Sequence, residues 1–346
     1  MGWLPSGRLM VGYASWSECD SKVEQAARAG VNVIVWFAIS LLADPRTGAP
    51  AITGGPNLTC VARTAASLAA VGVRTTHMIS VGGWDAPHPD TRFGAAEWWR
   101  VWTQWNAASA AAGFGGFDGI DWDLEGNDAM ASPANRFTVA GLHLVGNLSR
   151  MAKDAGYVVS LAPPQSYLNV GTSNFSLSLN NPATCWHPEF LYAGRNAYAS
   201  LLALAGEATF DYVLLQLYES WSVADCNISQ LQQPAEAYLP RLVAAMDSGW
   251  TVTFSTAPEL GLPDQTIRVP SHKLVLGLAN GWTSLSPPAK KALLLMPDTL
   301  GKAYKAMGDR PARGFGFWDI ADEGKVVDGN PLYLAAGLNS FLKVRG

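Results

Sequence analysis

The feature that most constrains the fold is a regular alternation of short apolar runs with longer Ala-rich segments of helical spacing. Eight such runs are expected to be strands: Leu9–Ala14, Val31–Ile39, Thr75–Val81, Phe117–Leu124, Tyr157–Ala162, Tyr212–Tyr218, Lys273–Leu278 and Gly314–Trp318. Many of them are apolar without alternation, as expected of parallel strands that are buried on both faces. Eight strands separated by helices predict an α/β protein built as a (β/α)8 barrel, because doubly wound sheets usually have five or six strands.

The segments between these runs predict helices that cover the barrel. They include Lys22–Ala29, Ala62–Ala70, Ala95–Ala112, Phe137–Ala155 and Ala235–Ser248, and a glycine follows each of them as a C-terminal cap. A barrel needs roughly 250 residues plus loop insertions, and the 346 residues contain no low-complexity linker. We therefore expect one catalytic domain over residues 1–346.

Two stretches break the regular spacing. The first runs from Pro163 to about Gly194 and follows the fifth predicted strand. Loops that leave the C-terminal ends of barrel strands build the active-site rim, so we expect this one to line the cleft. The second, Trp250–Pro270, precedes a strand. We expect it to form a short hairpin on the opposite face.

Composition and charge limit the partners. The chain is 49% hydrophobic and 15% charged with a net charge of -4, as in a globular protein with a sizeable core. It has no run of Lys or Arg and no apolar stretch near the ~20 residues of a membrane span. We expect neither a nucleic-acid nor a membrane partner, and we expect a monomer.

Two features favour secretion, although the Met1–Pro5 start lacks the apolar core of a signal peptide. We expect a leader absent from this chain. Four Asn-X-Ser/Thr sequons begin at Asn57, Asn147, Asn174 and Asn227. Four cysteines form an even set that three connectivities satisfy, and we favour Cys19–Cys60 and Cys185–Cys226 because these pairs close the shorter loops. Chance sequons and reduced cysteines are the alternative.

The segment that carries chemistry is Gly116–Gly126, with four acids in an otherwise apolar strand. Side chains at i, i+2 and i+4 of a strand share one face, so Asp121, Asp123 and Glu125 should point together into the barrel. Glu125 would lie at the C-terminal end, where barrel active sites form. Burial and mutual repulsion should raise the pKa of at least one of these carboxyls. A carboxylic acid that stays protonated near neutral pH is what cleavage of a glycosidic bond requires.

A metal site or a solvated acidic loop could also collect acids. A calcium loop alternates acids with turn-forming Gly and Asn, whereas Ile120, Trp122 and Leu124 stand between the acids here. A solvated face would not carry a large apolar residue at every second position. His77, His88 and His143 show no ligand spacing. We predict neither a metal nor another cofactor.

The acidic run resembles the Asp-X-X-Asp-X-Asp-X-Glu signature of glycoside hydrolase family 18, the chitinases and their relatives. Further elements follow in the family's order along nearly the whole chain. Ser80–Trp84 resembles its Ser-X-Gly-Gly element, and Gln216-Leu217-Tyr218 its Gln-X-Tyr. The matching aromatic strand ends are Tyr13, Phe37 and Trp318. The acidic signature is highly specific, whereas the other elements alone would be weak.

The resemblance implies hydrolysis with retention, in which the substrate's own 2-acetamido oxygen attacks the anomeric carbon. Glu125 would be the proton donor and then the base, and Asp123 would orient the acetamido N–H. Asp121 would share a proton with Asp123, and Tyr218 would donate its hydroxyl to the acetamido carbonyl.

We also expect a set of substrate contacts. They are Gln216, Trp318, Tyr13, Phe37, Trp84 and Glu219. Trp221 and Trp282 are weaker candidates for sugar platforms, while Ser80, Gly82 and Gly83 are expected to be structural and to give close backbone approach beneath the acids.

Two departures from the family pattern refine the expectation. Relatives commonly have Asp or Asn where this chain has Glu219. Gly281–Arg313, between the last two strands, has room for a loop and one helix only, without the α+β insertion of the larger chitinases. This layout resembles the small class III chitinases and favours an open groove and endo-type cleavage.

Three functions stay open at this point. The first is an endochitinase acting on β-1,4-linked N-acetylglucosamine polymers. The second is an endo-β-N-acetylglucosaminidase acting on N-glycan cores. The third is a non-catalytic chitin-binding lectin or inhibitor on the same barrel. Such non-catalytic relatives typically lose the acid equivalent to Glu125, which this chain retains.

Overall fold

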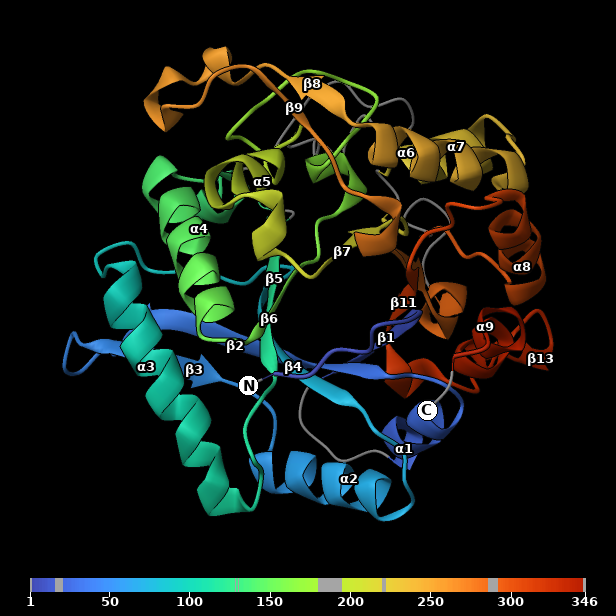
Figure 1. Cartoon of the computed structure of the whole chain (residues 1–346), viewed down its shortest axis with the longest axis horizontal. Coiled ribbons are helices and arrows are strands. Elements are labelled where there is room, and N and C mark those ends of the chain that lie inside the picture. Colours follow the sequence, from blue (N-terminus) through green and yellow to red (C-terminus); the bar gives the residue numbers. More distant parts are fainter. Residues whose placement is uncertain are drawn as a thin grey trace.

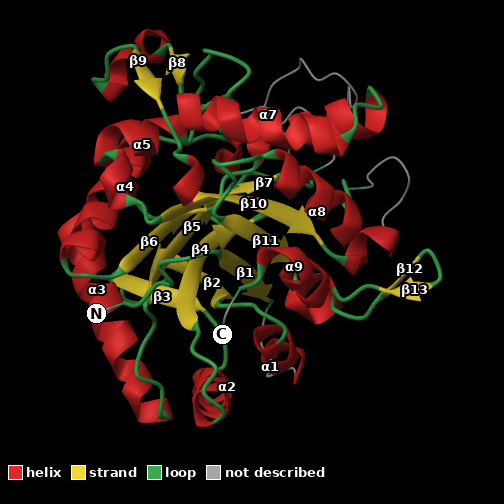
Figure 2. Ribbon diagram, turned by 45° about the vertical axis from the view of Figure 1, so that its right-hand side comes forward, coloured by secondary structure: helices red, strands yellow, loops and turns green. Residues whose placement is uncertain are grey.

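The computed structural model describes residues 2–15, 21–127, 129, 131–179, 195–219, 222–285 and 292–344. Eight parallel strands close into a barrel with helices outside them (Figures 1 and 2). In barrel order these are β1 (Leu9–Ala14), β2 (Val33–Ala43), β4 (Thr76–Gly83), β5 (Gly119–Leu124), β6 (Val158–Leu161), β7 (Tyr212–Gln216), β10 (Leu274–Ala279) and β11 (Gly314–Trp318). Strand β1 pairs with both β2 and β11, which closes the ring. The predicted (β/α)8 fold is confirmed.

The strand bounds differ from the prediction at two informative places. Strand β2 continues to Ala43 and forms an antiparallel hairpin with β3 (Pro50–Gly54), which the apolar pattern did not indicate. Strand β7 ends at Gln216, so Tyr218 lies in the loop beyond the strand rather than on it. A residue just past a strand end lies at the mouth of the barrel, where catalytic groups of this architecture are found.

The outer helices follow the predicted segments closely. They are α1 (Ser21–Arg28), α2 (Leu58–Ala70), α3 (Ala95–Ala108) with η1 (Ser109–Ala112), α4 (Val139–Asp154) and α7 (Ala235–Ser248). The side chains of Asn57 and Thr138 cap the N-termini of α2 and α4. Helices α5 (Ala199–Ala205), α8 (Pro297–Ala306) and α9 (Leu334–Leu342) complete the main set. Other short elements are α6 (Val223–Asp225), the pair β12 (Val326–Val327) and β13 (Asn330–Pro331), and the single turns η2 (Pro133–Asn135), η3 (Gln165–Tyr167), η4 (Glu207–Thr209), η5 (Cys226–Gln230), η6 (Phe254–Thr256), η7 (Pro258–Leu260), η8 (Ser271–Lys273) and η11 (Ile320–Asp322).

The apolar core has two layers, separated by the strands themselves. The outer layer lies between strands and helices and includes Trp98, Trp102 and Trp122, each at most 1% exposed. The inner layer fills the barrel with residues such as Val11, Val35 and Leu214. Packing on both sides explains why the strands are apolar without alternation. Buried polar side chains on the inner face of the strands, such as Asp121 and Asp123, are therefore exceptions whose presence has to be explained.

The two insertions lie against each other. Strands β8 (Trp250–Val252) and β9 (Gln265–Ile267) form the predicted hairpin. Its Thr253 N–H donates to the Ser173 carbonyl at 2.8 Å, and the Phe254 ring lies 5.1 Å from that of Phe175. The two insertions therefore do not lie on opposite faces of the barrel as expected, because apolar residues of both pack together. Residues 180–194 of the first insertion lie outside the described residues.

Between β10 and β11 the described residues form η9 (Gly281–Leu285) and helix α8, as expected for a barrel without an α+β insertion there. Within the described ranges, no helix is both long and apolar enough to cross a membrane. Cys60 and Cys226 are not free thiols, and their predicted partners Cys19 and Cys185 lie outside the described residues. The pairing stays a prediction.

Candidate active site

Three acids stand in a column on the inner face of β5. Asp121, Asp123 and Glu125 are 0%, 4% and 6% exposed. Their order follows the period of two along the strand, so Asp121 is deepest and Glu125 lies just beyond the strand's C-terminal end. The parallel register places Ser80 of β4 and Ser160 of β6 on either side of Asp121.

Asp121 is surrounded by hydroxyl donors. Ser160 Oγ donates to one carboxylate oxygen at 2.5 Å, and Tyr13 Oη and Ser80 Oγ donate to the other at 3.0 and 3.2 Å. Burial raises the pKa of Asp121, and the three hydrogen bonds oppose that rise because they favour the charged form. The donors come from β1, β4 and β6, so closure of the barrel is what brings them to one carboxyl.

Asp123 shares a hydrogen bond with Glu125. The proton shared between Asp121 and Asp123 stays a prediction. Gln216 Nε2 donates to Asp123 Oδ1 at 2.8 Å. Burial, followed by the charge of Glu125, raises the pKa of Asp123 well above its ordinary value. Burial, followed by the charge of Glu219, raises the pKa of Glu125 to about 8. Two buried carboxyls in contact cannot both ionise cheaply, so this pair holds a proton near neutral pH.

Glu219 is a fourth buried carboxyl at this level. It is 7% exposed, and its Oε2 is buried with no hydrogen-bond partner among the described residues. Burial raises the pKa of Glu219 to about 8. Its effect on Glu125 places the two within electrostatic range. The longer side chain at this position therefore keeps a carboxyl beside the acid pair.

Tyr218 lies beside the same acids. Burial is the main cause that raises the pKa of Tyr218 well above its ordinary value, and the charges of Glu219, Glu125 and Asp123 add to it. The Tyr218 phenol therefore keeps its proton near neutral pH, and its O–H can donate a hydrogen bond. The Tyr218 ring meets Trp282 edge-on at 6.2 Å, which fixes the ring from the η9 side.

Trp318, at the end of β11, contacts two of the predicted aromatic residues. Its ring centroid lies 4.7 Å from that of Phe37 and 5.8 Å from that of Tyr13. Tyr13 and Phe37 are 3% and 6% exposed, whereas Trp318 is partly exposed. The ring of Trp318 thus rests on two buried rings. Tyr13 itself supports Asp121 and does not offer its hydroxyl to the groove.

The other predicted contacts divide into two groups. Gln216 is 2% exposed and gives its amide N–H groups to Asp123 and to the Ala162 carbonyl, so it holds an acid in place. Trp84 follows β4 and is 39% exposed, as a sugar platform would need to be. Trp221 lies outside the described residues.

The paired glycines after Ser80 are structural, as predicted. A Cβ on Gly82 would lie 2.3 Å from the carbonyl oxygen of Asp123, and one on Gly83 would lie 2.1 Å from the Phe37 ring. Both have φ near the left-handed region, at 108° and 106°. Only glycine allows β4 to approach β5 this closely at the level of the acids.

Sequence reasoning missed several polar residues around the site. Asp319 is 7% exposed, and within the described ranges its buried Oδ1 has no hydrogen-bond partner. His88 and Tyr198 hydrogen-bond the backbone of Glu125 and Leu124. Asp319 directly follows Trp318, which was a usable signal. The other two lie in loops that no local pattern connects to β5.

The fold and the buried acids together define a (β/α)8 barrel with a carboxyl pair at its C-terminal mouth. No family model and no curated protein matches the sequence. Solved structures do match. One is a glycoside hydrolase family 18 chitinase from Pseudoalteromonas aurantia, with 14% identity, a TM-score of 0.53, and coverage of 91% of this chain and 95% of that chain.

Two further solved structures are similar over most of their length. The Legionella pneumophila ChiA C-terminal domain has 13% identity, a TM-score of 0.54, and coverage of 91% of this chain and 94% of that chain. The catalytic domain of a hyperthermophilic chitinase from Pyrococcus furiosus has 13% identity, a TM-score of 0.52, and coverage of 99% and 96%. At these identities the likeness shows the fold. Two of these neighbours are chitinases, and one of them is a chitinase of family 18, the family whose motifs the sequence resembles.

Proposed function

We propose that the protein is a secreted, endo-acting chitinase that hydrolyses β-1,4-linked N-acetylglucosamine polymers with retention of configuration. The observation that carries the proposal is the hydrogen-bonded Asp123–Glu125 pair, buried at the barrel mouth, with the pKa of Glu125 raised to about 8. An acid that keeps its proton at neutral pH can protonate a glycosidic oxygen.

In the proposed reaction, Glu125 gives its proton to the leaving oxygen while the substrate's acetamido oxygen attacks the anomeric carbon. The glycosidic bond breaks and an oxazolinium ion forms. Asp123 exchanges its bond with Glu125 for one from the acetamido N–H, and its negative charge offsets the positive charge that develops there. The Glu125 carboxylate then accepts a proton from the water that opens the ring, which restores the acid and gives the β-anomer.

Two residues position the substrate in this scheme. Tyr218 donates its hydroxyl to the acetamido carbonyl and holds that oxygen in line with the anomeric carbon. Trp318 presents its ring to the apolar face of the sugar at the cleaved subsite. Support comes from the charges that act on Tyr218 and from the buried aromatic rings beneath Trp318.

Endo-type cleavage is proposed because the described residues between β10 and β11 form only η9 and α8. A short connection leaves the groove open to a polymer that continues past both ends. Hexameric and longer chitooligosaccharides should then be cut at internal bonds. Release of disaccharide alone from every length tested would contradict this part of the proposal.

The deciding experiment is a product profile on chitooligosaccharides of increasing length, with a high-mannose glycoprotein as second substrate. We expect cleavage of the oligosaccharides, with the β-anomer appearing first. Cleavage of the glycoprotein alone would assign the chain to the N-glycan endoglycosidases. Binding without turnover would assign it to the lectins. An α-anomer as first product would exclude assistance by the acetamido group.

Secretion is proposed on separate grounds. Asn57, Asn147 and Asn174 are exposed, so a glycan at these sequons would meet no packed surface. Asn227 is half-buried and uses its Nδ2 to donate to the Val223 carbonyl, which disfavours a glycan there. After expression through a eukaryotic secretory pathway, removal of N-glycans should lower the mass by one to three glycans. An unchanged mass would remove this support.

A further inference from the structure

The backbone of β5 is held on both sides of the barrel wall. The inner side carries the acids, and the outer side faces loops that the proposed reaction does not use. There His88 Nε2 lies 3.0 Å from the carbonyl oxygen of Glu125. A carbonyl oxygen can only accept, so Nε2 carries the hydrogen and donates it. Burial lowers the pKa of His88, so the imidazole is neutral in this contact.

The His88 ring is fixed by its neighbours. It stacks on Phe137, with ring centroids 4.9 Å apart and planes at 21°. Phe137 in turn meets Tyr198 edge-on at 5.9 Å. Tyr198 Oη accepts from the Leu124 N–H at 2.5 Å and donates to the Leu124 carbonyl at 3.0 Å. The three rings, from three different loops, pack together, and two of them hold three consecutive peptide groups at the end of the catalytic strand.

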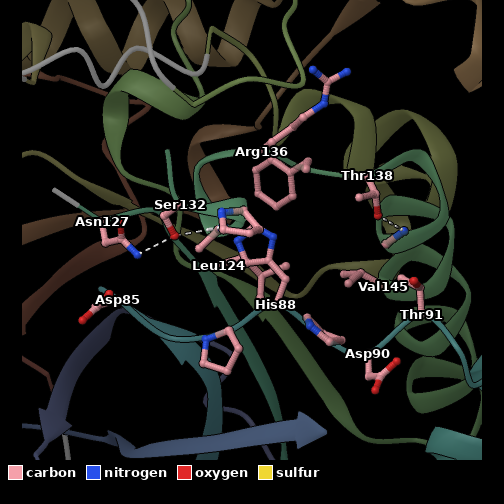
Figure 3. Close-up of a pocket in the computed structure, with 16 residues that line it drawn as sticks. Asp85, His88, Asp90, Thr91, Leu124, Asn127, Ser132, Arg136, Thr138 and Val145 are labelled. Carbon is pink, nitrogen blue, oxygen red and sulfur yellow. Dashed lines mark hydrogen bonds between the residues drawn. The ribbon is translucent and has the colours of Figure 1, made fainter. Parts of the chain in front are cut away.

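Two of these rings, His88 and Phe137, border a cavity of about 580 Å³ between the loops that follow β4 and β5 (Figure 3). The outward side chain of Leu124 forms another part of its wall. The cavity lies on the outer side of the β5 wall, whereas the Glu125 carboxyl lies on the inner side. A small molecule could thus reach the position of His88 without entering the proposed substrate groove.

We propose that His88 is a positioning residue for the proton donor: its hydrogen bond to the Glu125 carbonyl fixes the peptide from which the Glu125 side chain projects. The inference rests on the proposed function. Glu125 lies one residue beyond the last β4–β5 pair, Gly83 with Leu124, and its carbonyl accepts from the His88 ring in the loop. Small displacements of a catalytic group are costly, since a shift of about 1 Å can reduce turnover on the order of 100-fold.

A pair of substitutions separates the hydrogen bond from the ring stack. His88→Gln retains an Nε2 donor and loses the ring, and His88→Phe retains a ring and loses the donor. We expect kcat to fall on the order of tenfold in H88F with KM within about twofold, and by less than about threefold in H88Q. Equal losses in the two variants, or wild-type kcat in H88F, would overturn the proposal. Thermal melting of both variants confirms that each is folded at the assay temperature.

Chemical rescue gives an independent test that uses the cavity. His88→Ala leaves a space continuous with it, large enough for added imidazole. Imidazole, which has an N–H, should restore kcat in a saturable way. The control is 1-methylimidazole, which has the same ring and no N–H donor, and it should not restore kcat. Rescue by both compounds, or by neither, counts against a role for the hydrogen bond.

Failure of the proposed function is distinguishable from failure of this inference. If the wild-type chain cleaves none of the substrates above, the proposed function fails whatever His88 does. Amide hydrogen exchange over residues 124–127 then still reports on the contact. We expect faster exchange there in H88F than in H88Q. Equal exchange in the two variants would show that His88 does not hold this backbone.

Discussion

Asp121 and Asp123 are two aspartates on one face of one strand, two residues apart and almost fully buried, yet their surroundings differ. Asp121 accepts hydrogen bonds from three hydroxyls. Asp123 has one amide donor and faces another carboxyl. Burial raises the pKa of both, but that of Asp123 rises well above its ordinary value. The number of donors therefore separates a supported charge at depth from a proton-sharing pair at the mouth.

The largest expected effect comes from removing the acid at the mouth. Glu125→Gln keeps the size of the side chain and removes the transferable proton. We expect turnover of a chitooligosaccharide to fall by at least about 1,000-fold, while binding measured by calorimetry changes little. Wild-type-like turnover would remove Glu125 from its proposed role.

Tyr218→Phe should have the next largest effect. The variant loses the hydroxyl that would hold the acetamido oxygen, and the ring can keep its contact with Trp282. We expect kcat to fall more than tenfold in steady-state assays. Trp282→Phe is a suitable control, because it alters the ring contact and leaves the hydroxyl. Retention of most activity in Y218F would mean that another group, such as Glu219, orients the acetamide.

Substitutions around the deeper acid, Asp121, should reduce kcat less. The shorter the hydrogen bond that is removed, the larger the reduction should be. Ser160→Ala removes the 2.5 Å bond to Asp121, and Ser80→Ala removes the 3.2 Å bond. Each loss should raise the pKa of Asp121 further and weaken its charge. We expect kcat to fall about threefold to tenfold for S160A and by less for S80A. The reverse order would show that bond length at this carboxyl does not measure its support.

Much of this arrangement was open to prediction from the sequence, and the missing part has a physical reason. The period of two along β5 is enough to place Asp121, Asp123 and Glu125 on one face of the strand. The partners of Asp121 could not be found in this way, because Tyr13, Ser80 and Ser160 meet it only through the register of a closed barrel. The pairing of Asp123 with Glu125 likewise depends on side-chain directions at the strand end.

The loops were less predictable than the strands. A hairpin after β7 and a long loop after β6 could be recognised from their composition, but not their mutual packing through Phe175 and Phe254. His88 has no ligand spacing and no amphipathic pattern around it. Its contact with Glu125 arises from the three-dimensional arrangement of two loops, which local sequence does not encode.

Glu219→Gln should shift the pH profile rather than abolish activity. The charge of Glu219 raises the pKa of Glu125, so its removal should lower that pKa. Glu125 would then lose its proton at a lower pH, and the alkaline limb of kcat should move down by about half a unit to one unit. The measurement is kcat from pH 5 to 9. An unmoved limb would show that Glu219 does not act on the proton donor.

The smallest expected effect is on the free energy of unfolding. Its dependence on pH tests the protonation state of Glu125 at the barrel mouth without any substrate. A carboxyl with a raised pKa binds its proton more tightly in the folded chain, so its contribution is fully present below the unfolded value of 4.5. It is lost as pH rises through the folded value of about 8. Glutamine does not titrate. Glu125→Gln should therefore unfold at a higher temperature than wild type at pH 8, with a gain of up to about 4 kcal/mol that disappears near pH 4.5. Ser160→Ala, which leaves the mouth unchanged, should show no such gain. A gain for E125Q that is the same at both pH values would mean that Glu125 ionises freely in the folded protein, and the contrast between the two levels of β5 would not hold.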